Sequence, residues 1–107
     1  MPVPTRSSLL LAALATLGLA SAALAHTPLC SCYDNGDGTV LCEGGFSDGS
    51  SASGVKMSVQ DASGNVLIEG AIDENGEYSF DKPEGAFTVN FEGGEGHSIV
   101  IKSDEIY

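Results

Sequence analysis

The 107-residue sequence predicts an all-β protein, a small antiparallel Greek-key sandwich. Three observations lead to this fold class. Clusters of Gly, Asn, Asp, Ser and Pro recur along the chain from residue 34 onward, and these residue types favour turns. The segments between the clusters are short, and several alternate apolar with polar residues, as half-buried strands do. No segment after residue 25 carries a convincing apolar stripe with the helical period, so no amphipathic helix is expected.

Residues 1–25 are predicted to be a secretory signal peptide that is cleaved. Arg6 provides the positive start, an Ala- and Leu-rich segment follows, and Ala23-Leu24-Ala25 matches the small-x-small cleavage pattern. A membrane anchor is the alternative, but no basic residue follows to stop translocation, and no second apolar segment is long enough to span a bilayer. We therefore expect a single domain over residues 26–107, periplasmic or secreted, that does not insert into a membrane.

About seven strands are expected in this domain, which is the strand number typical of such a sandwich. The predicted strands lie near residues 28–33, 38–46, 54–60, 65–72, 76–80, 86–91 and 97–102. Alternation assigns the inward positions of several of them: Val55, Met57, Val59, Tyr78, Phe80, Phe87, Val89, Phe91, Ile99 and Ile101. The last five residues, SDEIY, are expected to fray.

The charge of the mature chain limits its partners. Three lysines stand against fifteen acidic residues, which gives a net charge of −12. Nucleic acids and anionic membrane surfaces require Lys and Arg, so neither is expected as a partner. An acidic surface is compatible with cations, or simply with solubility.

The three cysteines flank the turn at residues 34–38. If the segments on either side pair as a hairpin, Cys42 falls opposite Cys30 or Cys32, depending on the register, and a cross-strand disulfide can form. One thiol is then left over. Such a disulfide suits a secreted domain. The alternative is that thiolates of Cys30 and Cys32 join a metal site, although the C-x-C spacing lacks the paired C-x-x-C of structural zinc sites.

The two histidines of the chain are the strongest metal-ligand candidates. After cleavage His26 becomes the first residue, and its α-amine and imidazole can chelate one ion. Amine and imidazole nitrogens suit Ni(II), Co(II), Cu(II) and Zn(II). Pro28 lacks an amide proton, so the square-planar site of successive deprotonated amides is excluded. His97 begins the last strand, and the first and last strands of a sandwich can be neighbours, so the two histidines can meet at one end.

Residues 54–101 carry a series of motifs with a familiar layout. They are Gly54-Val55 with Asp61 and Gly64, then Asp73-Glu74-Asn75-Gly76-Glu77-Tyr78-Ser79-Phe80, then Gly85-Ala86-Phe87-Thr88-Val89, and finally Gly96-His97. This series resembles the carboxypeptidase regulatory-like (transthyretin-like, or prealbumin-like) domains, which implies a sandwich fold that serves many binding roles. The whole layout, with His26 and Gly96-His97, is also similar to the small periplasmic accessory subunits of nickel/cobalt energy-coupling transporters. That resemblance implies a transition-metal ion and a membrane transporter as partners.

Three functions are compatible with these features. The first is a periplasmic protein that binds Ni(II) or Co(II) through His26, His97 and a cysteine, and supports metal uptake by a membrane transporter. The second is a periplasmic copper-binding protein with the same N-terminal chelate. The third is a metal-free extracytoplasmic structural or interaction module stapled by one disulfide. An enzyme is not expected, because no nucleophile elbow and no paired His/Asp arrangement stand out.

Overall fold

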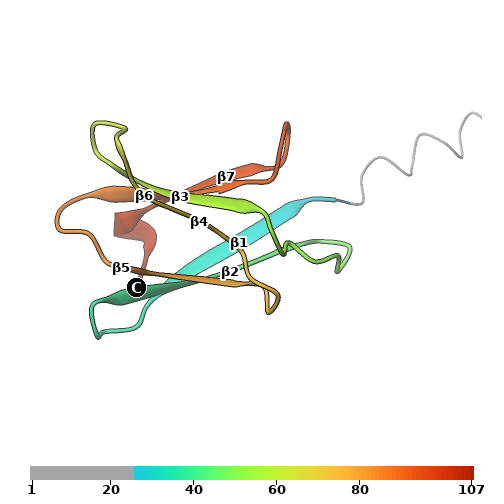
Figure 1. Ribbon diagram of the computed structural model, residues 1–107, viewed down its shortest axis with the longest axis horizontal. Helices are drawn as coiled ribbons and strands as arrows, with labels where there is room; N and C mark the ends of the chain where they lie inside the picture. Colours follow the sequence, from blue (N-terminus) through green and yellow to red (C-terminus); the bar gives the residue numbers. More distant parts are fainter. Residues whose placement is uncertain (1–25) are drawn as a thin grey trace, which may run out of the picture.

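The computed structural model describes residues 26–107, and the signal peptide predicted over residues 1–25 lies outside the described residues. Two antiparallel sheets face each other and enclose the core between them (Figure 1). The elements are β1 (Pro28–Asp34), β2 (Thr39–Phe46), β3 (Lys56–Asp61), β4 (Val66–Ala71), β5 (Glu77–Asp81), β6 (Phe87–Glu92), β7 (Ser98–Lys102) and the short 3₁₀ helix η2 (Ser103–Glu105). The all-β sandwich expected from the sequence is confirmed, with strand bounds within two residues of those predicted.

The strands form a three-stranded sheet in the order β1-β2-β5 and a four-stranded sheet in the order β4-β3-β6-β7. The chain crosses between the sheets after β2, after β4 and after β5, so strands distant in sequence become neighbours. At the open side of the sandwich the edge strand β1 contacts β7, the edge strand of the other sheet. The first and last strands therefore lie beside each other, as expected from the sequence. Among residues 26–107, no helix combines the length and apolar character that crossing a membrane requires.

The core consists of the inward side chains of both sheets. The fully or almost fully buried apolar residues include Val40, Met57, Val59, Ile72, Phe80, Phe87, Val89 and Phe91. In β6 every second residue is buried, which is the alternation that predicted this strand. Ile99 and Ile101 of β7 are only partly buried and pack against the edge of the core.

The hairpin formed by β1 and β2 determines the position of the chain's first residues. Its register pairs Pro28 with Phe46 at one end and Asp34 with Val40 at the other. In the connecting turn, a side-chain oxygen of Asp34 accepts a hydrogen bond from the N–H of Gly36 (2.8 Å). Gly36 has a φ of +77°, a backbone conformation that glycine adopts without steric penalty. This turn chemistry explains why the sequence signal for the hairpin is strong.

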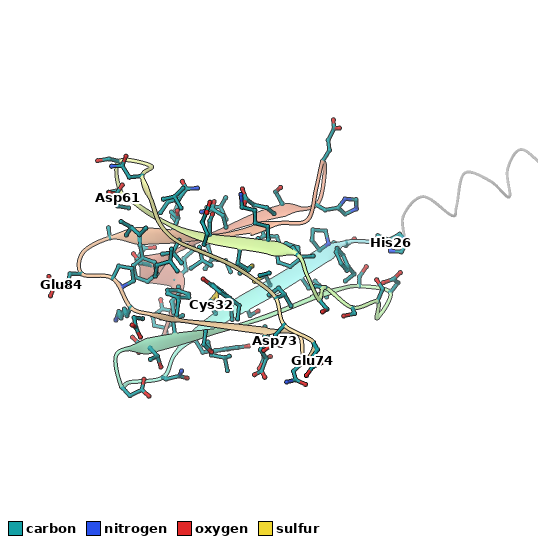
Figure 2. All side chains as sticks on the ribbon, in the orientation of Figure 1. His26, Cys32, Asp61, Asp73, Glu74 and Glu84 are labelled. Carbon is teal, nitrogen blue, oxygen red and sulfur yellow. A yellow bond between two sulfur atoms is a disulfide. The ribbon has the colours of Figure 1, made fainter. Side chains whose placement is uncertain are left out.

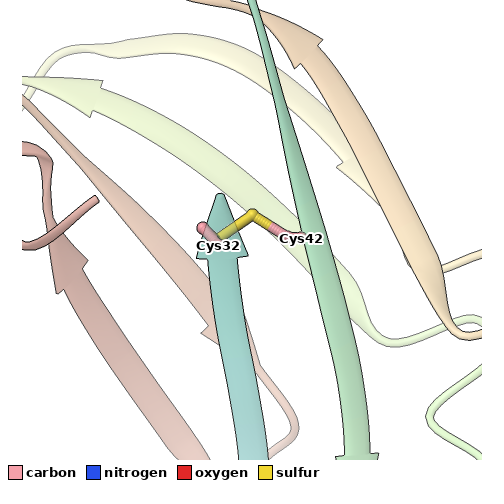
Figure 3. The surroundings of a disulfide bond; sticks show 2 residues. All are labelled: Cys32 and Cys42. Carbon is pink, nitrogen blue, oxygen red and sulfur yellow. A yellow bond between two sulfur atoms is a disulfide. The ribbon is translucent and has the colours of Figure 1, made fainter. Parts of the chain in front are cut away.

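A disulfide between Cys32 and Cys42 joins β1 to β2 across this hairpin (Figure 3). The two residues are direct partners in the register, and both are buried. Of the two pairings that the sequence left open for Cys42, the structure has the one with Cys32. Cys30, which lies opposite Gly44, is a free thiol.

The C-terminal residues are ordered, and the prediction that SDEIY frays is wrong. Residues Ser103–Glu105 form η2, and Ile106 packs against the core. The N–H of Asp34 donates a hydrogen bond to the backbone oxygen of Tyr107 (3.0 Å), so the tail is tied to the end of β1. An apolar contact and a backbone hydrogen bond together hold a terminus that otherwise frays.

Replacing Cys42 with alanine is expected to lower the free energy of unfolding by about 2–4 kcal/mol, because the unfolded chain loses its cross-link. Cys30→Ala is the matched control, since it removes one sulfur and leaves the disulfide intact. It should cost less than about 1 kcal/mol. Urea unfolding followed by circular dichroism measures both, and equal losses would show that the disulfide adds nothing to stability.

Candidate metal site

His26 and His97, which lie near opposite ends of residues 26–107, line one hollow at the surface of the sandwich. The hollow has a volume of about 200 Å³, and Phe46, Ser50 and Gly93 complete its lining. Figure 2 shows His26 at the opposite end of the sandwich from Asp61 and Glu84. The side chain of His26 is 61% exposed, so an ion can reach it from solvent. The structure thus brings together the two histidines that sequence reasoning selected.

His26 is held by Asp48, a residue that sequence reasoning missed. Nδ1 of His26 lies 2.7 Å from Oδ2 of Asp48. This contact continues the β1–β2 register beyond the last strand pair, since the residue two before Pro28 faces the residue two after Phe46. Between them, the N–H of Ser47 donates a hydrogen bond to the oxygen of Thr27 (2.9 Å). Only the register of the hairpin reveals the pairing of His26 with Asp48.

Asp48 is ionised at neutral pH. The hydroxyl and then the N–H of Ser50 donate hydrogen bonds to its Oδ1, at 2.6 and 2.9 Å, and these lower the pKa of Asp48. The neighbouring His26 lowers this pKa further. An ionised carboxylate can only accept hydrogen bonds, so Nδ1 of His26 carries the proton between the two groups. A fixed negative charge therefore lies beside His26, one of the residues that line the hollow.

His97 is oriented by the turn that precedes β7. Its Nδ1 lies 3.0 Å from the backbone oxygen of Glu95. A carbonyl oxygen can only accept, so Nδ1–H is the donor and Nε2 of the neutral ring is left with a free lone pair. A ring N–H bonded to a carbonyl, with the other nitrogen free, is the arrangement that orients histidine ligands in metal sites. The ring also packs edge to face on Phe46, with centroids 6.2 Å apart.

The glycines before His97 are required by the geometry of this turn. The N–H of Gly93 bonds to the oxygen of His97 (3.1 Å), and the N–H of His97 bonds to the oxygen of Gly94 (2.9 Å). A Cβ at Gly93 would lie 2.6 Å from the oxygen of His97, closer than real contacts allow. Gly94 and Gly96 have positive φ values, of 101° and 76°. The turn geometry of the EGGEGH sequence therefore fixes the position of His97 immediately before β7.

The cysteines do not join the histidines in the structure. The prediction that Cys32 supplies a thiolate ligand is wrong for this structure, because its sulfur is bonded to Cys42. Cys30 lines a different hollow, of about 430 Å³, whose other residues include Tyr33, Ile101, Glu105 and Tyr107. Burial raises the pKa of the Cys30 thiol to about 11, which keeps it protonated. The register explains why neither cysteine joins the histidines, because it places Cys32 directly opposite Cys42 and Cys30 opposite Gly44.

The preformed donor set at the histidine hollow is small. Within residues 26–107, no group of three or more His, Cys, Asp or Glu side chains stands ready to hold a metal ion. The contacts described above supply an imidazole nitrogen on His97 and the His26–Asp48 pair. Further ligands would come from the α-amine of His26, which is free only when residues 1–25 have been removed, or from water.

No protein-family model matches the chain, and neither a curated protein nor a solved structure matches it. The resemblance to carboxypeptidase regulatory-like domains therefore stays a prediction carried by the sequence motifs. The structure itself establishes a disulfide-linked, seven-stranded antiparallel sandwich with a two-histidine hollow.

The raised pKa of Cys30 leads to a kinetic prediction. Only the thiolate reacts with iodoacetamide, so in the folded protein the alkylation rate should rise about tenfold per pH unit from pH 7 to pH 10. In urea, with the disulfide intact, the rate should level off near the ordinary thiol pKa of 9.0. The folded state binds the proton of the Cys30 thiol more tightly than the unfolded state does. The free energy of unfolding should therefore fall as the pH rises above 9.0. A folded-state rate that levels off near pH 9 would contradict the assignment.

Proposed function

We propose that the mature protein binds a borderline transition-metal ion, Ni(II) or Co(II), outside the cytoplasm and delivers it to a membrane transporter. One observation carries the metal-binding part of this proposal: the chain's two histidines line a single hollow, and His97 has its Nε2 free and its Nδ1 anchored. Imidazole nitrogens with carboxylate or amine neighbours suit borderline divalent ions.

The ligands follow from the contacts around His26. When His26 is the first residue, its α-amine and Nδ1 can close a chelate ring on one ion. The ion then replaces the proton between Nδ1 and Asp48, so a carboxylate oxygen of Asp48 becomes available as a third donor. The α-amine has a pKa of about 8, so part of it is neutral at pH 7. Nε2 of His97 completes a site of three nitrogens and one oxygen. Because protons leave when the ion binds, affinity should rise with pH.

The charge of the domain favours capture of cations. The mature chain carries a net charge of −12, which raises the local concentration of divalent ions and their rate of encounter. Several of these carboxylates lie in turns and accept local backbone hydrogen bonds, as Asp61 and Asp73 do. Together these carboxylates create a negative electrostatic potential that attracts cations to the protein, and the histidine hollow supplies the specific ligands.

The choice of nickel or cobalt, and of a transporter as partner, rests on the resemblance of the sequence to the accessory subunits of nickel/cobalt energy-coupling transporters. Copper is the second candidate, because a site of nitrogens and one carboxylate binds Cu(II) more tightly than Ni(II). Availability of the metal outside the cytoplasm then decides which ion is carried. If no ion binds, the remaining function is that of a metal-free structural or interaction module.

Titration calorimetry of the exported, processed protein with Ni(II), Co(II) and Cu(II) tests the proposal. One extra serine before His26 should weaken Ni(II) binding by about tenfold or more, because it moves the α-amine away from the imidazole. His97→Ala should do the same by removing Nε2. Asp48→Asn should weaken binding, whereas its matched control Asp61→Asn, at the opposite end of the sandwich, should not.

Three results would contradict the proposal. The first is an unchanged affinity in the serine-extended protein, which would rule out the N-terminal chelate. The second is mass spectrometry of the exported protein showing a first residue other than His26. The third concerns the aspartate variants. Equal weakening by Asp48→Asn and Asp61→Asn would mean that only the general negative charge attracts the ion.

A further inference from the structure

The three cysteines stand in an arrangement that allows their disulfide to change partners. Cys30 and Cys32 both belong to the inward face of β1, and both line the hollow between β1 and η2. Cys42 faces Cys32 directly, whereas Cys30 faces Gly44, the next inward position of β2. Neighbours on the same face of a strand are about 7 Å apart, so Cys30 cannot bond to Cys42 in the present register.

A shift of β1 by two residues toward the hairpin turn would bring Cys30 opposite Cys42. Side chains alternate with a period of two, so such a shift keeps every inward residue inward. It also preserves the alternation of hydrogen-bonded and non-hydrogen-bonded pairs in an antiparallel ladder. β1 is an edge strand and pairs only with β2, so a single ladder has to re-form. Pro28 would then face Gly44, where no side chain opposes it.

The shift would break contacts at both ends of β1 and change its packing on β7. At the turn end the broken contacts are the ion pair of Asp34 with Lys82 (2.7 Å), which is partly exposed, the hydrogen bond from Asp34 to Tyr107, and the backbone and side-chain hydrogen bonds from Asn35 to Thr39. At the other end they are the contacts of Thr27 with Ser47 and of His26 with Asp48. The turn residues can take up the extra length, because this loop is rich in glycine and exposed.

We propose that Cys30 exchanges with the Cys32–Cys42 disulfide, so that the protein has two disulfide isomers whose β1 registers differ by two residues. The exchange begins when the thiolate of a small thiol such as glutathione attacks Sγ of Cys42, so that the Cys32–Cys42 bond breaks and Cys32 leaves with the electron pair and takes up a proton. β1 is then free to shift. The thiolate of Cys30 next attacks Sγ of Cys42 in the mixed disulfide, the Cys30–Cys42 bond forms, and the small thiol leaves with the electron pair and takes up the proton that Cys30 released. The small thiol is regenerated, and no net oxidant or reductant is consumed.

The register shift would move His26 as well. His26 precedes β1 by two residues, so a two-residue slide carries it about 7 Å along the strand, away from Asp48 and toward the position opposite Phe46. The Cys32–Cys42 isomer holds His26 beside Asp48 at the hollow, and the Cys30–Cys42 isomer separates His26 from Asp48. If the proposed function is correct, on which this last step rests, the disulfide isomer decides whether the metal site is assembled.

The exchange is expected to be slow without a catalyst. Burial keeps the Cys30 thiol protonated at neutral pH, and the groups that line its hollow are Tyr33 on β1, Glu105 on η2 and Tyr107 after it. None of these is basic, and β7 contributes only Ile101, so nothing at the hollow stabilises a thiolate. A small thiol such as glutathione, or an external isomerase, can open the first bond.

Two matched serine variants test the inference. Cys30→Ser can form only the Cys32–Cys42 bond, and Cys32→Ser can form only the Cys30–Cys42 bond. Produced with export, Cys32→Ser should contain no free thiol, and tandem mass spectrometry should show Cys30 joined to Cys42. NMR should then show close α-protons for Cys30 and Cys42 in place of the pairing of Cys30 with Gly44. In the unaltered protein, incubation with a glutathione redox buffer should move part of the free thiol from Cys30 to Cys32.

Calorimetry with Ni(II) tests the coupling. Cys30→Ser should bind as the unaltered protein does, and Cys32→Ser should bind about tenfold or more weakly. The inference is overturned if Cys32→Ser keeps two free thiols, if its register is unshifted, or if it binds Ni(II) as tightly as Cys30→Ser. Failure of the proposed function would look different, because neither variant would bind Ni(II), and the shift would then be judged by thiol mapping and NMR alone.

Discussion

The antiparallel pairing of β1 with β2 is the constraint on which the rest of the structure depends. The Cys32–Cys42 disulfide holds this pairing in one register. The register closes one side of the core, and it carries the chain's first described residue to Asp48. It also places the end of β1 beside the C-terminal residues through the hydrogen bond from Asp34 to Tyr107. One ladder and one covalent bond thus determine the position of both ends of the domain described over residues 26–107.

The histidine hollow shows how backbone features tune a site with few side chains. A carbonyl oxygen selects the tautomer of His97, and this leaves Nε2 free to bind an ion. The carboxylate of Asp48, which Ser50 holds, orients the ring of His26 through Nδ1. The glycines of the turn before β7 allow the backbone to approach itself closely enough to present the ring. Strand register orients the ring of His26, and turn geometry orients the ring of His97. A small sandwich can therefore position two histidines at its surface without a deep cleft.

The separation of thiol and imidazole groups has a chemical consequence. Cys30 lies in its own hollow, whose lining includes two tyrosines, Ile101 and Glu105, and neither histidine lines it. The histidine hollow therefore offers nitrogen and oxygen donors, which suit borderline divalent ions better than soft monovalent ones. A buried, protonated thiol beside a disulfide is instead a slow exchange partner, and the compartment that oxidised Cys32 and Cys42 would decide how often it acts.

The sequence by itself determined the strands and the turns, because alternation and turn chemistry are local: Met57 and Val59 are inward, and Gly36 lies in a positive-φ turn. It also determined that Cys42 faces the C-x-C pair. It did not distinguish Cys30 from Cys32, since an alternating pattern repeats every two residues and fits both registers equally well. Only the tertiary structure decided that register, and with it the contact between His26 and Asp48. The order of the C-terminal residues could not be predicted from local sequence either, because Ile106 packs against core residues that are distant in the chain.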